Sequence, residues 1–279
     1  MSKKQKKISL IVYFSLIAIL LVLCFLVPGN PKHESIQDAM TDAVLHELNL
    51  VSLFGIKNVN PGLISAYVVT AVILLFAVIV RLFVIPKFKY VPGKFQIALE
   101  QMVGFFDDLA KTNSPHKNNF IGAYIFSAGL YIFIGTLFEL FGIQVIGIHG
   151  NSIALPAPLA DINGAISMGG LSYLVILGGG FICAGLKGGL KTLKDFSLPI
   201  SMSFRLFGAL LSGLLVTELV YYYLPLSFVL PVVVGVLFTL IHALVQAYVL
   251  AMLTALFYGE AVEKHPKKEK KKVTQVQEA

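Results

Sequence analysis

Long uncharged apolar runs constrain the fold of this chain more than any other feature of its sequence. A helix needs roughly 20 apolar residues to cross the hydrocarbon core of a bilayer. Runs near that length occupy Ile8–Val27, Pro61–Val80, Phe120–Phe138, Ile162–Leu186, Ile200–Tyr223 and Pro231–Tyr258. With 57% hydrophobic and only 13% charged residues, the composition argues against a soluble globule. The sequence therefore predicts an all-α, polytopic transmembrane protein of about six spans.

Three regions follow from this pattern. We expect a membrane anchor and external segment over 1–60, a membrane domain over 61–262, and a Lys-rich cytoplasmic tail over 263–279. A basic start before an apolar run is also typical of a signal peptide. The run of roughly 20 residues exceeds the usual 7–15, and no small-residue cleavage site follows Pro28, so we favour an uncleaved anchor. Cleavage is the alternative, and it would leave five spans.

The net charge of +7 is explained by orientation in the membrane. With the first end of the chain in the cytoplasm, 19 of the 22 basic residues lie on the cytoplasmic side. Only Lys32 and Lys57 lie outside, and Arg205 lies within a span. This is the positive-inside distribution. It predicts a cytoplasmic C-terminus and gives no reason to expect nucleic acid as a partner.

The sequence contains no pattern typical of a cofactor site. Cys24 and Cys183 both lie in apolar runs, where a thiol behaves as a small hydrophobe. The Gly-rich stretch around Gly185 places Leu186 where a phosphate-binding loop needs Lys. We expect no cofactor, no metal site and no enzymatic activity of the chain on its own.

Arg205 is the strongest candidate for a functional residue. A charge inside a bilayer is costly, and guanidinium cannot lose its charge by releasing a proton. The next acid along its own span, Glu218, is thirteen residues away, about 20 Å along a helix. The two side chains therefore cannot pair directly. Snorkelling of Arg205 to the membrane interface is the alternative.

Small side chains surround Arg205 and recur on the last span. The residues at helical spacing around Arg205 are Ser201, Gly208, Ala209 and Ser212. The last span has small residues every four positions, at Ala243, Ala247, Ala251 and Ala255. Such stripes let another helix approach closely. Packing inside the chain would explain either stripe alone, but two stripes near a buried arginine indicate a contact surface for an outside partner.

Other polar residues can form a graded path through one half of the membrane. Counting from the turn near Leu226 places Gln246 level with Arg205, His242 one turn further out and Glu218 further still. Three more candidates can converge on the same outer half, namely Glu139, Asp161 and Asn163. Spaced titratable groups that end at a permanent cation are what a proton half-channel needs. For each acid, the role of an interfacial loop residue is equally open, and His242 can instead be a satisfied bundle histidine.

Two motifs carry a resemblance to a known family. Ser201-Met-Ser-Phe-Arg205-Leu-Phe-Gly208 and Gln246-Ala-Tyr-Val resemble subunit a of the F-type rotary ATP synthase. Weaker matches lie at Val91-Pro-Gly-Lys94, at Leu137-Phe-Glu139-Leu and at Asp161-Ile-Asn163.

The resemblance implies that the last two spans are long, tilted helices that form a hairpin against the ring of c subunits. It makes Arg205 the arginine that faces the ring carboxylate, with Gln246 near it. Asp161, Asn163 and Glu139 would belong to the external access path. The implied partners are the c-ring, subunit b of the peripheral stalk and the lipid bilayer. The implied location is the bacterial plasma (inner) membrane.

The sequence departs from the family pattern at several positions. Ala209 stands where the family usually has Asn, and Leu214 and Thr239 stand where members often carry Glu or His. We hypothesise that Glu218 and His242 replace this outer pair.

The function expected is therefore that of a stator subunit. Its two offset half-channels would pass protons or sodium ions to and from the ring and couple their passage to rotation and ATP synthesis. The alternatives are a secondary transporter that binds an anionic substrate at Arg205, and a structural assembly subunit.

Overall fold

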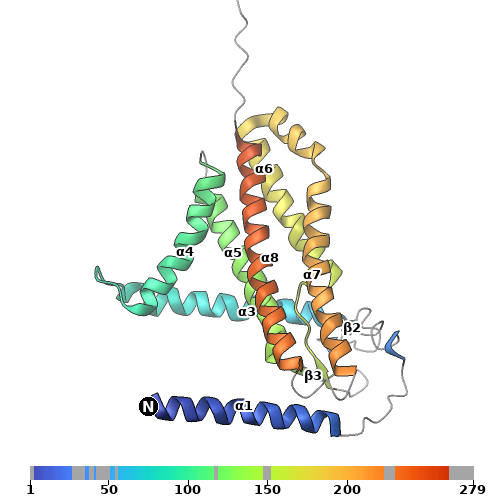
Figure 1. Cartoon of the computed structure of the whole chain (residues 1–279). Coiled ribbons are helices and arrows are strands. Elements are labelled where there is room, and N and C mark those ends of the chain that lie inside the picture. Colours follow the sequence, from blue (N-terminus) through green and yellow to red (C-terminus); the bar gives the residue numbers. More distant parts are fainter. Residues whose placement is uncertain are drawn as a thin grey trace, which may run out of the picture.

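Helices dominate the computed structural model of the chain. It describes residues 3–26, 35–37, 41, 51–53, 56–115, 119–146, 152–222 and 230–263. The central bundle consists of α5 (Asn119–Phe138), α6 (Ile162–Lys194), α7 (Ser197–Tyr222) and α8 (Leu230–Val262), with α4 (Lys94–Asn113) beside it (Figure 1). The expectation of an all-α polytopic membrane protein is confirmed.

Five helical segments in the described part of the chain are long and apolar enough to cross a membrane. They are Pro61–Lys87, Asn119–Phe141, Ile162–Lys194, Ser197–Thr217 and Gly235–Val262. The first expected span is not among them. Helix α1 (Lys3–Leu26) lies across the end of the bundle (Figure 1), and Ile8–Leu20 is the apolar part of it whose side chains are described without a gap. Its described side chains are nearly all exposed, so α1 is not packed into the bundle.

Helix α3 (Pro61–Ile79) precedes the bundle, and its first turn is capped by a side chain. It starts at Asn60, whose side-chain Oδ1 accepts a hydrogen bond of 2.8 Å from the Gly62 amide. The helix continues through a π-helical turn (Val80–Val84) and a 3₁₀ turn (Ile85–Lys87) that contains Pro86. Only its first half is buried, from Pro61 to Val69. The remainder is therefore an apolar surface suited to lipid.

Helix α4 is the amphipathic segment between α3 and α5. Lys111 forms an ion pair with Asp107 one turn earlier on its exposed face. The hydrogen bond that Lys111 donates to Asp107, together with the negative charge of Asp107, raises the pKa of Lys111. The apolar side of α4 packs against the bundle, where Phe106 contacts Phe126 of α5.

Two short antiparallel hairpins were not predicted from the sequence. Strands β1 (Val51–Leu53) and β2 (Ile56–Val59) form the first hairpin, before α3. The second connects α5 to α6 through β3 (Gln144–Ile146) and β4 (Ser152–Ala154). Each strand has three or four residues, which is too short for a periodic signal. They are connections at the end of the bundle and leave the fold class unchanged.

Helix α6 reverses direction at Gly185, which has φ 67° and ψ −164°. This left-handed backbone is readily adopted only by glycine. Beyond it the chain folds back, so that the Tyr173 hydroxyl donates a hydrogen bond of 3.3 Å to the Thr192 carbonyl. The basic residues that follow the expected end of the span therefore lie on a short helical segment that leads directly into α7.

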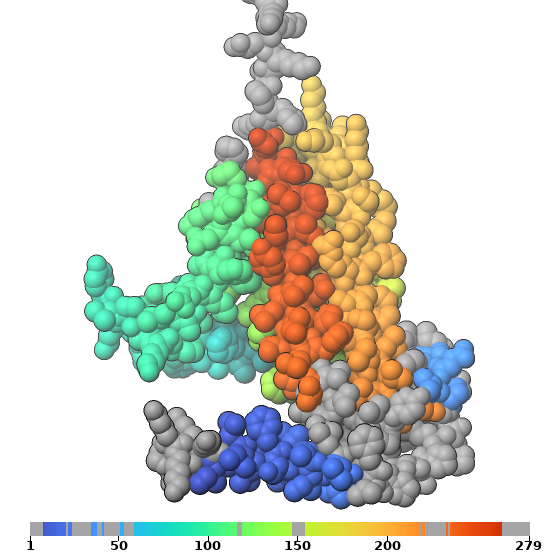
Figure 2. Space-filling model, viewed as in Figure 1, coloured from blue at the N-terminus to red at the C-terminus, as the bar shows by residue number. Residues whose placement is uncertain are grey.

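The main core lies where α5, α6, α7 and α8 meet. It contains Ile121, Ile125 and Ile132 of α5, Met168 and Ile176 of α6, Met202, Leu206 and Leu210 of α7, and Leu250 and Tyr258 of α8. A second cluster joins β1, β2 and the first half of α3 to Phe138 and Leu155. The inner sides of α7 and α8 thus pack against α5 and α6. Figure 2 shows α7 and α8 along one face of the molecule.

Candidate functional site

Arg205 of α7 and Gln246 of α8 line the same small cavity. Its other lining residues are apolar: Met202, Leu206, Val249, Leu250 and Leu253. The empty volume is about 170 Å³, and no part of it admits a water-sized sphere. This agrees with the equal depth that residue counting assigns to Arg205 and Gln246. The hairpin thus places a guanidinium and a carboxamide together between two apolar helix faces.

Gln246 is buried, with 7% of its surface exposed. Its side-chain oxygen Oε1 has no hydrogen-bond partner among the described residues. A buried carbonyl without a donor typically costs about 1–3 kcal/mol. The site therefore holds one unused acceptor beside the arginine.

Arg205 is exposed on α7. Among the side chains that the structure describes, none forms an ion pair or hydrogen bond with it. Ser201, Gly208 and Ser212 on the same face are also exposed, and Ala209 is half-buried. Arg205 is therefore a cation on an open strip of small residues, without an anion from the described part of the chain.

The alanine stripe of α8 does not lie on that open surface. Ala243, Ala247 and Ala251 are only 0%, 6% and 1% exposed and belong to the chain's own core. They permit close packing of α8 with α5, the most extensive helix contact in the structure. The expectation that these three alanines contact an outside partner is corrected accordingly. The exposed face of α8 carries bulky residues instead, among them Ile241, Leu244, Val245 and Tyr248.

His242 is half-buried, and its partners lie on its own helix. Its Nδ1 is 3.0 Å from the carbonyl oxygen of Phe238. The centroids of the His242 and Phe238 rings are 4.2 Å apart, and the two ring planes are tilted by 37°. Phe238 in turn lies against α7 at Gly213, where an added Cβ would be 3.4 Å from the Phe238 ring. The structure thus supplies the satisfied environment that was the alternative to a channel role for His242.

Glu218 lies on the last turns of α7, and its side chain is outside the described residues. The two helices are antiparallel, and Arg205 lies level with Gln246 and Gly213 with Phe238. His242 is therefore level with Ala209, and Glu218 is about 14 Å further along the axis. The hypothesised pair is separated by more than two helical turns.

Asp161 and Asn163 form a polar cluster at the start of α6. Asp161 is the N-cap residue, and its Oδ1 is 3.4 Å from both the amide nitrogen and the side-chain Nδ2 of Asn163. Gly62 of α3 lies against it, because an added Cβ there would be 3.1 Å from Asp161 Cβ and 3.2 Å from Asn60 Oδ1. The starts of α3 and α6 therefore meet, and Asn60 joins the two expected residues. Sequence reasoning missed Asn60, although an Asn directly before Pro61 is a helix-start signal.

Glu139 begins the 3₁₀ turn Glu139–Phe141 at the end of α5 and is half-buried. Because α5 ends and α6 begins at the same end of the bundle, Glu139 lies at the end that carries Asp161 and Asn163 (Figure 1).

Another cavity, which is polar, lies near the C-terminal end of α8, away from the end of the bundle that carries Asp161. Charged and polar residues line it, namely Lys191, Thr192, Asp195 and Glu260, together with apolar residues of α6, α7 and α8. Its empty volume is about 270 Å³. Sequence reasoning did not single out Glu260, which follows the last apolar run. Within the described part of the chain, no group of three His, Cys, Asp or Glu residues could hold a metal ion.

Comparisons with known proteins identify the family. The model of the family described as "ATP synthase A chain" matches residues 63–259. The curated protein "ATP synthase subunit a 2" of Vibrio campbellii is 26% identical over 204 residues, which cover 63% of this chain and 79% of that protein. The match runs from the first turn of α3 to the last turn of α8 and includes both Arg205 and Gln246. The chain therefore belongs to the ATP synthase A chain family, as a non-catalytic membrane subunit of the F-type complex.

Proposed function

We propose that the chain is the stator past which a ring of c subunits turns. The observation that carries this proposal is the environment of Arg205. The guanidinium is exposed on a strip of small residues and has no anion among the described residues. A permanent charge at membrane depth needs a counter-anion. A carboxylate on a passing rotor helix would supply it, and the strip of small residues would let that helix approach closely.

The external half of the path uses the polar groups at the start of α6. Ions enter past Glu139, Asp161 and Asn163, reach the α7–α8 hairpin near Glu218 and His242, and neutralise a rotor carboxylate. Support comes from the convergence of the α3 and α6 starts around Asp161 and from the position of Glu139 at the same end of the bundle.

Arg205 separates entry from exit. Its positive charge attracts the ionised carboxylate that arrives after an ion has left, and it repels protons that would otherwise cross directly. Gln246 supports this role because its unpaired Oε1 can accept from the guanidinium when Arg205 moves to meet the rotor. The polar cavity at Lys191, Asp195 and Glu260 offers the exit on the other side. Passage of an ion then requires rotation.

The assembly follows from the same role. The chain lies in a bacterial plasma membrane with its C-terminus in the cytoplasm, contacts the c-ring through α7 and α8, and is held by subunit b of the peripheral stalk. The coupled ion is a proton or sodium, and the choice resides in the ring carboxylate. A transporter that binds an anion at Arg205 is less well supported, because the cavity beside Arg205 admits no water-sized sphere.

Cysteine crosslinking in the assembled complex tests the contact surface. Ser201→Cys and Ser212→Cys place thiols on the exposed strip of α7, and Leu171→Cys places one on the exposed side of α6. With single cysteines along the outer helix of the c subunit, oxidation should join the two α7 positions to the ring and leave position 171 unlinked. If neither α7 position forms a crosslink while the complex is intact, the ring does not face this strip.

A further inference from the structure

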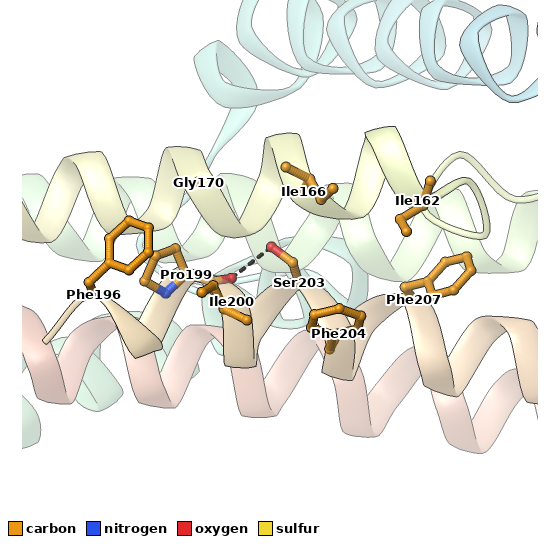
Figure 3. Close-up of a pocket in the computed structure, with 9 residues that line it drawn as sticks. All are labelled: Ile162, Ile166, Gly170, Phe196, Pro199, Ile200, Ser203, Phe204 and Phe207. Atoms are coloured by element: carbon orange, nitrogen blue, oxygen red, sulfur yellow. Dashed lines mark hydrogen bonds between the residues drawn. The ribbon is translucent and has the colours of Figure 1, made fainter.

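A cavity larger than the two described above lies away from Arg205, between α6 and α7. Its empty volume is about 690 Å³. Gly170, Ile166 and Ile162 line it from α6 (Figure 3). The opposite wall is mostly aromatic and aliphatic, with Phe196, Pro199, Ile200, Ser203, Phe204 and Phe207. We call it the α6–α7 groove. Ile166 and Phe204 are 54% and 64% exposed, so the groove opens on the surface of the molecule.

The chemistry of the groove is apolar throughout. Ser203 is its single polar side chain, and its hydroxyl already donates a hydrogen bond of 2.7 Å to the Pro199 carbonyl (Figure 3). The groove thus offers no free polar group to orient a polar or charged ligand. Both walls belong to helices long enough to span a membrane. Its occupant must therefore be apolar where it touches the groove.

The dimensions favour a single hydrocarbon chain. From Phe196 at one end to Phe207 at the other, the groove follows α7 for about 16 Å. This is half of a hydrocarbon core of about 30 Å, the depth of one leaflet. An empty volume of 690 Å³ over that length gives a cross-section on the order of tens of Å², less than that of a helix about 10 Å in diameter. A helix of a partner protein would not fit into it.

Positive charge lies at the Phe196 end. Lys194 is exposed two residues before Phe196, and Lys187 is exposed on the same segment beyond Gly185. Asp195, between Lys194 and Phe196, is also exposed, so the net charge of these three residues is positive. Lysines at a membrane surface attract anionic headgroups. We propose that the α6–α7 groove binds one acyl chain of an anionic phospholipid from the leaflet on the Lys194 side, with its headgroup at Lys194. The bound chain fills the side of α7 that faces α6, which is away from Arg205.

The glycines of α6 provide a matched test. An added Cβ at Gly170, in the groove, meets nothing within 4 Å, and the same is true at Gly178, which does not line the groove. Gly170→Leu has room for its Cβ and should extend the rest of its side chain into the groove, whereas Gly178→Leu adds the same side chain elsewhere on the helix. The full chain, in vesicles of phosphatidylcholine and phosphatidylglycerol, is labelled with phosphatidylglycerol that carries a photoreactive diazirine in its acyl chain. Labelled peptides are then identified by mass spectrometry.

We expect labelling of α6 and α7 peptides that contain Ile166 and Phe204. It should fall at least fivefold in Gly170→Leu and stay within twofold of the unmodified chain in Gly178→Leu. Labelling of the apolar α3 surface is the internal measure of correct insertion, since both variants leave it untouched. Equal labelling of Ile166 and Phe204 in both variants would overturn the proposal, as would an absence of label there while α3 is labelled.

The headgroup is tested separately. A phosphatidylcholine probe with the same acyl diazirine should label the groove several-fold less than the phosphatidylglycerol probe, and Lys194→Gln should reduce that difference. Equal labelling by the two probes would remove the anionic headgroup from the proposal. A photoreactive benzoylphenylalanine in place of Phe204, in the assembled complex, tests whether a protein subunit occupies the groove. Crosslinking to a protein subunit in place of lipid would contradict the acyl-chain assignment.

Discussion

Arg205 and Gln246 come from two different helices and meet at one dry cavity, where the amide oxygen of Gln246 has no donor. Because the exposed guanidinium and the buried carboxamide share this cavity, a small movement of Arg205 toward the core would satisfy the amide oxygen, and a movement outward would present the charge to a partner. Arg205 can thus take two positions, one at the amide oxygen of Gln246 and one at an acceptor on a partner. A contact with a rotor that repeatedly forms and breaks requires such an alternation.

Removal of the unpaired side-chain oxygen of Gln246 should raise the stability of the chain but lower its function. Gln246→Leu replaces a buried, unsatisfied carbonyl by an apolar group of similar shape, so the chain should become more stable by about 1–3 kcal/mol, while ion flux through the complex falls. Thr254 is the matched control, since its buried Oγ1 also lacks a partner among the described residues. Thr254→Val should also stabilise the chain but leave flux unchanged. Thermal unfolding in detergent and flux in vesicles measure the two effects. Loss of flux in both variants would mean that Gln246 has no special role.

The alanine stripe should matter for packing of the chain itself. Ala247→Leu adds volume to a well-packed helix contact and should destabilise the isolated chain by about 1–3 kcal/mol. Val245→Leu, at a 48% exposed position on the same helix, should be nearly neutral. The unfolding midpoint of the purified chain in detergent shows the difference. Full stability of Ala247→Leu outside the complex would return this alanine to the list of rotor contacts.

Two glycines of α8 should respond in opposite directions to alanine. Gly235 has open space around an added Cβ, so Gly235→Ala should stabilise the helix by about 0.5–1 kcal/mol. At Gly259 the added Cβ would collide with the carbonyl oxygen of Asn113 at the end of α4. Gly259→Ala should therefore loosen the docking of α8 on α4 and lower the unfolding midpoint. Protease cleavage after Asn113 offers a local readout, and resistance equal to the unmodified chain would contradict this contact.

Ion flux tests the hypothesis that Glu218 and His242 replace the usual outer pair of the family. Glu218→Gln should slow ion-driven flux through the complex, because it removes a titratable group from the proposed path. Glu263→Gln, on the exposed end of α8, is the control and should have no effect. A double variant that exchanges the two residues, Thr239→His with His242→Thr, moves the histidine by one helical turn. Its ion flux shows which of the two positions the histidine must occupy. Unchanged flux in Glu218→Gln would exclude Glu218 from the path.

Residue counting placed Arg205 and Gln246 at the same depth because both belong to regular helices with only seven residues, 223–229, between them, and a rise of 1.5 Å per residue leaves little freedom within each helix. The same regularity did not assign the alanine stripe, since small residues permit close packing equally well inside a chain and between chains. Burial of Ala247 against α5 decides that question, and only tertiary structure contains it.

Other features depended on single residues within repetitive sequence. Gly185 is one of several glycines between 178 and 189, and nothing in the sequence distinguishes the one that takes a positive φ. The contact between Gly62 and Asp161 joins residues about 100 positions apart. Periodicity describes one helix at a time, so it could not predict that the starts of α3 and α6 meet.

Substitution of Arg205 tests the central claim most directly. The chain has two arginines, and Arg81, on the exposed π-helical turn after α3, is a matched control. Ion-driven ATP synthesis is measured in vesicles that contain the assembled complex. Arg205→Ala should abolish synthesis because the rotor carboxylate loses its cation, and Arg205→Lys should also fail because an ammonium lacks the planar fork. Arg81→Ala should keep full activity. Normal synthesis by either Arg205 variant would contradict the account.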